Sequence, residues 1–268
     1  MDKAVSRLIT TGIFTSTMFA GNVYADGLQD LKQSLAKLKG DSSIQASLES
    51  SHTQNRDKEE DLKTTTGYIN LSLSNSSDGL QITYSSDVLE KLEQEQLLSD
   101  QDEEADTPTL NAMNRLETTN LNRMLSAASS LSRFIEKAKF IEEVPTDYQG
   151  EMARRLVFNL PLESIVDNAE VRGYVDDFDG KYTLIIDEHG LPKQSILSFA
   201  GSGSAFLFFS VEMEQTLTSS YQTHGDRLVI VQEEVQRSSS STWADTESVS
   251  LKHLTVHSGP QHLAKTLN

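Results

Sequence analysis

The sequence predicts a mainly β, α+β fold in which a curved antiparallel sheet forms an open half-barrel closed by a helical lid. Residues 172–256 consist of short apolar, β-branched or aromatic segments that are separated by glycine-containing turns. Their regular spacing is typical of one curved sheet or an open barrel. The predicted strands are residues 172–177, 181–187, 191–200, 205–213, 216–223, 227–237 and 248–256.

The turns between these strands are placed where glycine can adopt the positive φ angle that short hairpins need. They are Asp179-Gly180, His189-Gly190, Gly201-Ser202-Gly203 and His224-Gly225-Asp226. A tip of four serines at residues 238–241 is expected to join the last two strands.

The composition makes two classes of partner unexpected. The 268 residues include 40 acidic and 23 basic side chains, for a formal charge of −17. Such a surface repels nucleic-acid phosphates and anionic membranes, so neither is expected as a main partner. The chain has no cysteine, so neither disulfides nor lipidation at cysteine can contribute.

Residues 1–25 have the pattern of a secretory signal peptide. Lys3 and Arg7 precede a mostly apolar segment, and Val23-Tyr24-Ala25 resembles a cleavage site. The apolar segment is shorter than the ~20 residues that cross a membrane. We therefore expect export to the periplasm rather than to the medium, and no spanning segment. A retained amphipathic helix is the alternative.

The exported chain is expected to form a single half-barrel domain over residues 26–258. Leu28, Leu31, Leu35 and Leu38 recur at three- and four-residue steps, which predicts an amphipathic helix. Alternating apolar residues then predict strands at 44–55, 64–74 and 80–84, with a charged turn or loop at 56–61 and a hairpin at Asp78-Gly79.

A helical insertion at residues 86–136 is expected to interrupt the sheet. It begins with a short helix to residue 98 and continues through the acidic loop 99–107. Pro108 then starts one long helix that reaches about residue 136. Its broad apolar stripe predicts packing on the sheet; a separate partner-binding helix is the alternative.

The rest of the chain completes the predicted order of elements. Segments 138–144 and 152–160 form a hairpin that Pro161 ends, and residues 162–169 form a helical turn. Residues 259–268 are expected to form a flexible tail.

The residue patterns predict no enzymatic activity, no metal site and no cofactor. On a strand at ~3.3 Å per residue, His253 and His257 lie about 13 Å apart, which disfavours a zinc pair. Val175 interrupts the acidic alternation of a calcium loop before Gly180, so a tight turn is favoured there. Residues 201–204 lack the pattern of a nucleophile elbow.

Segment 205–209, Ala-Phe-Leu-Phe-Phe, is apolar on both faces if it is a strand. One face can then pack on the long helix while the other lines a cavity. A central strand covered by helices on both sides is the alternative. The candidate ligand-binding residues are Leu71, Leu73, Ile82, Met124, Phe199, Phe206 and Phe208.

Two stretches carry a resemblance to a known family. The first runs from the leucine helix through Thr66-Gly67-Tyr68-Ile69-Asn70-Leu71 to the strand that ends at Tyr84. The second is Asp187-Glu-His-Gly190-Leu191-Pro192 with its flanking strands. The chain resembles the periplasmic lipoprotein carriers of the Lol pathway and their superfamily. The family pattern is a helix, strands of the type G-x-L-x-L, an aromatic-ended strand and a later D-x-x-G-L-P turn.

The resemblance spans residues 28–84 and 171–256, and it leaves 85–161 as an enlarged lid. It implies a half-barrel closed by helices around an apolar cavity that receives lipid chains. We therefore expect a periplasmic carrier or chaperone that binds a lipid or an acylated protein. The alternative is a non-catalytic envelope protein with a filled core, in which the acidic loop 99–107 binds a protein partner.

Overall fold

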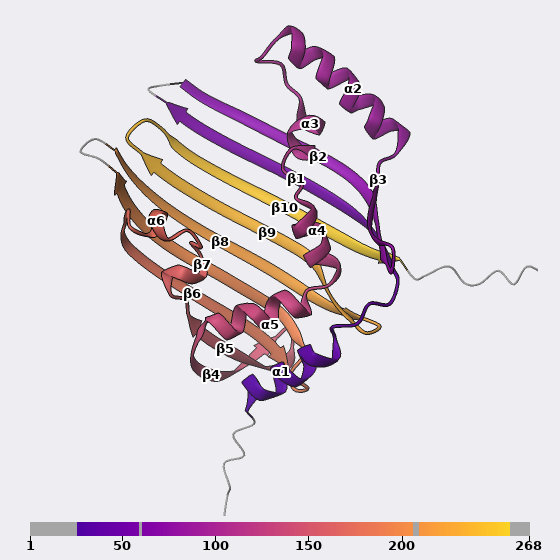
Figure 1. Ribbon diagram of the computed structural model, residues 1–268, viewed down its shortest axis with the longest axis vertical. Helices are drawn as coiled ribbons and strands as arrows, with labels where there is room; N and C mark the ends of the chain where they lie inside the picture. The colour runs from indigo at the N-terminus through magenta and orange to yellow at the C-terminus, as the bar shows by residue number, and fades with distance from the viewer. Residues whose placement is uncertain (1–25, 59–60, 206–208, 258–268) are drawn as a thin grey trace, which may run out of the picture.

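The computed structural model describes residues 26–58, 61–205 and 209–257 (Figure 1). Its strands are β1 (Ile44–Lys58), β2 (Asp61–Ser76), β3 (Gly79–Thr83), β4 (Lys139–Tyr148), β5 (Glu151–Asn159), β6 (Val175–Asp187), β7 (Pro192–Ala205), β8 (Phe209–His224), β9 (Arg227–Ser241) and β10 (Asp245–His257). Its helices are α1 (Gly27–Lys37), α2 (Ser86–Gln101), α3 (Pro108–Met113), α4 (Thr118–Leu125), α5 (Ala128–Lys137), the short 3₁₀ helix η1 (Leu162–Ser164) and α6 (Ala169–Arg172).

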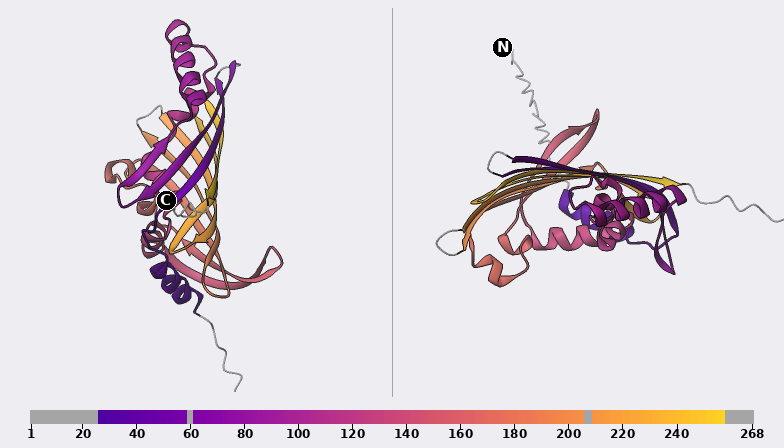
Figure 2. Two further views of the ribbon diagram at one scale, coloured as in Figure 1. Left: turned by 90° about the vertical axis from the view of Figure 1, so that its right-hand side faces the viewer. Right: turned by 90° about the horizontal axis from the view of Figure 1, so that it is seen from above.

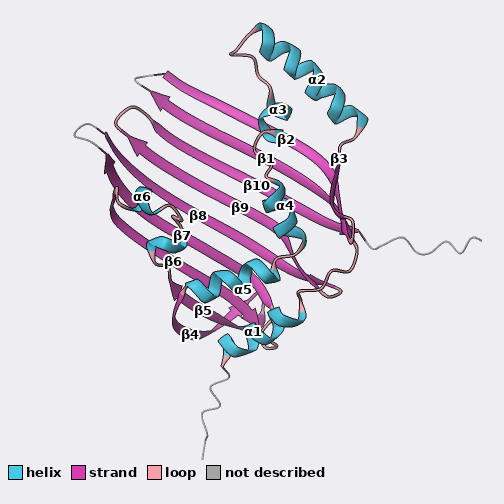
Figure 3. Cartoon of the chain, viewed as in Figure 1, coloured by secondary structure: helices cyan, strands magenta, loops and turns pink. Residues whose placement is uncertain are grey.

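All the named strands belong to one antiparallel sheet. It has ten strands in the order β3-β2-β1-β10-β9-β8-β7-β6-β5-β4. The sheet curves and stays open, and the helices lie on its concave face (Figure 2). Figure 3 shows strands as the main part of the chain and helices as a partial cover. The predicted α+β half-barrel is thus confirmed.

Alternation along the strands separates a buried face from an exposed one. In β1 and β2, Ala46 lies opposite Leu73 and Leu48 lies opposite Leu71, and all four side chains are buried. Leu48 also lies opposite Leu254 of β10, so the first and last strands of the chain share one core. This register places every second residue against the helices.

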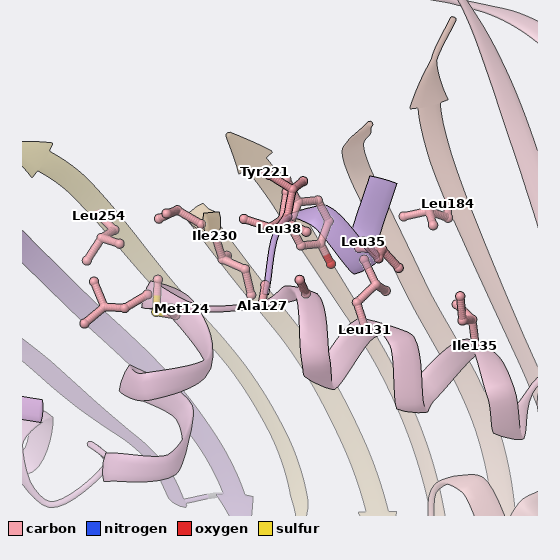
Figure 4. Close-up of a cluster of buried hydrophobic side chains, with 14 of the residues drawn as sticks. Leu35, Leu38, Met124, Ala127, Leu131, Ile135, Leu184, Tyr221, Ile230 and Leu254 are labelled. Carbon is pink, nitrogen blue, oxygen red and sulfur yellow. The ribbon is translucent and has the colours of Figure 1, made fainter. Parts of the chain in front are cut away.

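The main hydrophobic core lies between the sheet and helices α1, α4 and α5 (Figure 4). Leu35 of α1, Met124 of α4 and Leu131 of α5 are buried there against Tyr221 and Ile230. Asp26 caps α1 by accepting a hydrogen bond from the backbone N–H of Gln29 at 3.1 Å.

The single helix predicted from Pro108 to about residue 136 is wrong, because the chain forms three helices there. The break between α4 and α5 is held by the backbone N–H of Ala127, which donates to the carbonyl of Leu228 on β9 at 2.8 Å. One straight helix could not follow the curved sheet, whereas three short helices can. The prediction that the apolar stripe packs on the sheet is confirmed, since Leu121, Leu125 and Ile135 are buried in the core.

Two of the four predicted turns in the meander are wrong. Gly180 lies inside β6 opposite Phe199, and Gly201 lies inside β7 opposite Phe178. The turns at Gly190 and Gly225 are confirmed, and both glycines have a positive φ angle.

Several predicted strand limits also change. Residues 209–213 and the predicted strand 216–223 belong to the single strand β8, and the serines at 238–241 belong to the end of β9. Residues 172–174 precede β6, and β1 and β2 extend into the predicted charged loop at 56–61.

The prediction of a single strand at 205–209 is wrong, because its two described ends belong to different strands. Ala205 ends β7, Phe209 begins β8, and the two residues lie opposite each other in the antiparallel pair. Phe206 and Phe208 lie outside the described residues, as do the predicted signal peptide and tail. In the described part of the chain, no helix is both long enough and apolar enough to span a bilayer.

Replacing Gly67 with alanine is expected to destabilise the protein. Gly67 is buried in β2, and a Cβ atom there would lie 2.9 Å from the backbone nitrogen of Ala112 in α3. Because a backbone atom cannot move aside as a flexible side chain can, we expect urea denaturation to show a loss of about 1–3 kcal/mol. Asn70→Ala, on the exposed face of β2, is the control and should change stability by less than about 0.5 kcal/mol. An unchanged or higher stability of Gly67→Ala would contradict this packing.

Candidate functional site

An apolar cavity of about 330 Å³ lies between the concave face of β6, β7 and β8 and the segment that contains η1 and α6. We call residues 162–174 the roof segment. In Figure 1 this segment lies over the sheet on the side away from α2 and α3. The cavity is lined by Leu162, Ile165, Val166, Val171, Tyr174, Val175, Phe178, Phe199, Gly201, Ser202, Gly203, Ser204, Val211 and Met213.

The roof segment is held in shape by its own polar contacts. The guanidinium of Arg172 donates to the backbone carbonyls of Val166 and Asp167, both at 2.8 Å. Asn168 caps α6 by accepting from the backbone N–H of Glu170 at 2.8 Å. These contacts satisfy polar groups within the segment, so its apolar side chains can face the sheet.

The roof segment approaches the sheet closely at Gly203. A Cβ atom there would lie 2.5 Å from the carbonyl oxygen of Tyr174, a distance no side chain tolerates. Next to it, the backbone N–H of Ser204 donates to the same carbonyl at 3.0 Å. Glycine in this strand therefore admits the backbone of the roof segment, as glycine often does where two chains pass closely.

The floor of the cavity is aromatic. The rings of Phe178 of β6 and Phe199 of β7 pack against each other in a tilted arrangement, with a centroid distance of 6.1 Å and an interplanar angle of 31°. Val211 and Met213 extend the apolar floor along β8. Both strands of the β7–β8 pair thus contribute apolar groups.

The cavity reaches solvent beside α6. Val171 is 48% exposed and Tyr174 is 53% exposed, yet both line the cavity. These two half-exposed hydrophobic side chains form the mouth of the cavity.

The chemistry of the lining fits an apolar ligand. Among the described residues that line it there is no acidic, basic or histidine side chain, and the polar side chains are the hydroxyls of Ser202, Ser204 and Tyr174. Its volume falls at the lower end of the range of about 300–1,000 Å³ that small-molecule sites occupy. Such a space can bind an apolar chain by burial and offers no charged group to promote a reaction.

A second cavity, of about 230 Å³, lies between α4, α5 and the sheet and has a polar wall. The hydroxyls of Ser195 and Tyr221 are 2.8 Å apart within it. Burial raises the pKa of Tyr221, and burial raises the pKa of the neighbouring Tyr182 further. Both phenols therefore stay protonated at neutral pH.

Beside this cavity, a buried glutamate is held by two cations. Glu233 of β9 is 1% exposed, and its carboxylate pairs with Arg123 of α4 and, at 3.1 Å, with Lys252 of β10. Burial acts to raise the pKa of Glu233, but the positive charges of Arg123 and Lys252 outweigh it and hold the pKa below its ordinary value. This cluster fastens α4 to the middle of the sheet.

The described residues contain no group of three or more histidine or acidic side chains placed to hold a metal ion. His253 and His257 lie on β10, as their alternation suggested, and both are exposed. His52 is buried, with Nδ1 2.7 Å from the hydroxyl of Ser250.

The predicted ligand-binding residues occupy different parts of the molecule. Leu71, Leu73 and Met124 are buried in the main core, and Ile82 packs against that core half-buried. Phe199 lines the apolar cavity. The structure therefore does not bring the first four together with Phe199, and Phe206 and Phe208 lie outside the described residues.

Sequence reasoning missed the roof segment and Phe178 as parts of this cavity. The usable signal was the presence of Leu162, Ile165, Val166 and Val171 in a short, irregular segment after Pro161. Leu162, Ile165 and Val166 follow the i, i+3, i+4 spacing of one helical turn, so their shared apolar face needs a surface to cover, and here that surface is the sheet.

No protein-family model matches this chain, and no curated protein matches its sequence.

The Glu233 cluster predicts a specific pH dependence of stability. Because the pKa of Glu233 is lower in the folded state than its ordinary value of 4.5, the folded protein binds fewer protons in this region. The resulting stabilisation is present above pH 4.5 and is lost as the pH falls through the folded-state pKa. Glu233→Gln should thus be about 2–3 kcal/mol less stable than the wild type at pH 7, because Arg123 and Lys252 would lose the negative charge that pairs with them.

The measurement is urea denaturation of both proteins from pH 7 to pH 3. The stability difference between the wild type and Glu233→Gln should shrink as the pH falls below 4.5. Glu234→Gln makes the same chemical change at the next residue of β9 and serves as the control. A difference that stays constant with pH would contradict the proposed charge compensation.

Proposed function

We propose that this protein is a non-enzymatic binding protein that holds an acyl chain or a similar apolar group in the cavity beneath the roof segment. The observation that carries the proposal is a cavity whose lining contains no charged side chain and whose mouth is formed by half-exposed apolar residues. Soluble proteins rarely keep such a surface open to water without a use for it.

The energetics favour an apolar ligand over a polar one. Each methylene that moves from water into the cavity contributes ~0.8 kcal/mol. A polar group that entered would lose its hydration and find few hydrogen-bonding partners. The roof segment and the sheet form the space before any ligand enters, so little ordering cost opposes binding.

The setting that we propose is the bacterial periplasm. The signal-like residues 1–25, the absence of cysteine and the resemblance to Lol-type lipoprotein carriers support it. The ligand would then be a lipid or the acyl group of an acylated protein, and the protein would act as its carrier or chaperone.

A second candidate function is that of an envelope interaction protein. Helix α2 projects from the sheet (Figure 2), and Leu89, Leu97 and Leu98 on it are each more than half exposed. The predicted acidic loop 99–107 begins within α2, which runs to Gln101, and its remaining residues follow the helix directly. An apolar and acidic projection of this kind fits a protein partner, and it is separate from the cavity.

Replacing Phe199 with aspartate should abolish ligand uptake. The carboxylate would lie in the apolar floor of the cavity, where its desolvation opposes filling by an apolar molecule. We expect the affinity for Nile red, an uncharged apolar dye, to fall at least ten-fold in a fluorescence titration.

Ser198→Asp is the matched control, because Ser198 is the preceding residue of β7 and lies opposite Lys181 on the convex face. It should bind Nile red as the wild type does. Circular dichroism and urea denaturation show whether Phe199→Asp remains folded, and Phe199→Leu provides an apolar replacement. Equal dye binding by the wild type and folded Phe199→Asp would contradict the cavity as the binding site.

A further inference from the structure

The surroundings of the cavity mouth carry an excess of negative charge. On the roof segment, Glu163 lies in η1, Glu170 lies in α6, and both are exposed. On β6, the carboxylate of Asp176 accepts a hydrogen bond from the hydroxyl of Ser204 at 2.7 Å, and Ser204 lines the cavity. Within the described residues, none of these three carboxylates forms an ion pair.

The nearby cations have other partners. Lys137 of α5 faces Asp167 at 3.9 Å. The guanidinium of Arg172 donates to the carbonyls of Val166 and Asp167 and so points into the roof segment. Neither cation is placed as a dedicated receptor for an anion at the mouth.

Accepting the proposed function, we propose further that the ligand is a single apolar chain whose polar end is neutral or positively charged. A carboxylate or phosphate at the mouth would add a negative charge next to elements that already carry Glu170 and Asp176, and like charges oppose binding. The chain's formal charge of −17 adds repulsion of the same sign. A hydroxyl, an ester or an ammonium group meets no such opposition.

The size of the cavity limits the apolar part. A volume of about 330 Å³ equals that of roughly eleven liquid water molecules, taking ~30 Å³ for each. This is room for one chain of moderate length and too little for both chains of a phospholipid. The site therefore fits a singly acylated or alkylated molecule.

Three ligands with the same ten-carbon chain length test the inference. Decanol is neutral, decyltrimethylammonium is a cation, and decanoate is an anion at pH 7.4. Each competes with Nile red for the full chain in 10 mM and in 500 mM NaCl, below its micelle concentration. At low salt the Debye length is ~30 Å, so charge effects at the mouth are largely unscreened.

We expect decanol and decyltrimethylammonium to displace the dye, and decanoate to bind at least ten-fold more weakly than decanol in 10 mM NaCl. This ratio should fall to about three-fold or less in 500 mM NaCl, because salt screens the carboxylates. In the triple variant Glu163→Gln, Glu170→Gln, Asp176→Asn, the ratio should be equally small at low salt.

A second triple variant controls for overall charge. Glu93→Gln, Glu103→Gln and Asp106→Asn remove three exposed carboxylates in or next to α2. Helix α2 lies at the opposite edge of the sheet from α6 (Figure 1). In this variant, the logarithm of the affinity ratio between decanol and decanoate in 10 mM NaCl should be at least half of its wild-type value.

The outcomes separate the two proposals. Equal binding of decanoate and decanol in 10 mM NaCl would overturn the charge inference and leave the proposed function standing. If both triple variants lost the preference for decanol over decanoate to the same extent, the assignment of this preference to Glu163, Glu170 and Asp176 at the mouth would be overturned. Failure of all three ligands and of Nile red to bind would overturn the proposed function itself.

Discussion

The structure depends on one constraint: a ten-stranded antiparallel sheet has an apolar face that must be covered. Strands β1, β2, β5, β6, β8, β9 and β10 all contribute buried apolar residues to the main core, and water must be kept from most of this surface. Burial of apolar area is the main available source of stability, because the chain has no disulfides. The positions of α1, α4 and α5 follow from this requirement.

The cover is uneven, and its unevenness creates the candidate site. Over the middle of the sheet, α4 and α5 bury large side chains such as Met124 and Leu131. Over the ends of β6, β7 and β8 around Phe178, Phe199 and Met213, the short roof segment covers the sheet and leaves an apolar cavity beneath it. Polar contacts of Arg172 and Asn168 fix the roof segment, and Gly203 lets it approach the sheet. A preformed apolar space results.

Local sequence patterns predicted the sheet, but they could not predict contacts between segments that are far apart in the chain. Period-two alternation is visible within a few residues, so Leu71 and Leu73 could be assigned to a buried strand face. The prediction of a turn at Gly201–Gly203 was wrong because both glycines lie inside β7, where Gly203 admits the backbone of Tyr174 from the roof segment. The breaks between α3, α4 and α5 reflect the curvature of the sheet. Phe199 could be predicted as a ligand-binding residue because the face of a strand follows from local alternation. The roof segment that covers it could not be predicted, because its position depends on long-range contacts.

The most direct test of the central claim, that the cavity holds an apolar chain, is native mass spectrometry of the protein purified from the cells that make it. We expect a bound species that organic extraction removes and that tandem mass spectrometry identifies as a single-chain amphiphile. Phe199→Asp, purified in parallel, should carry none. A ligand-free mass for the wild type, together with no uptake of added decanol or Nile red, would contradict the claim and favour the interaction surface on α2.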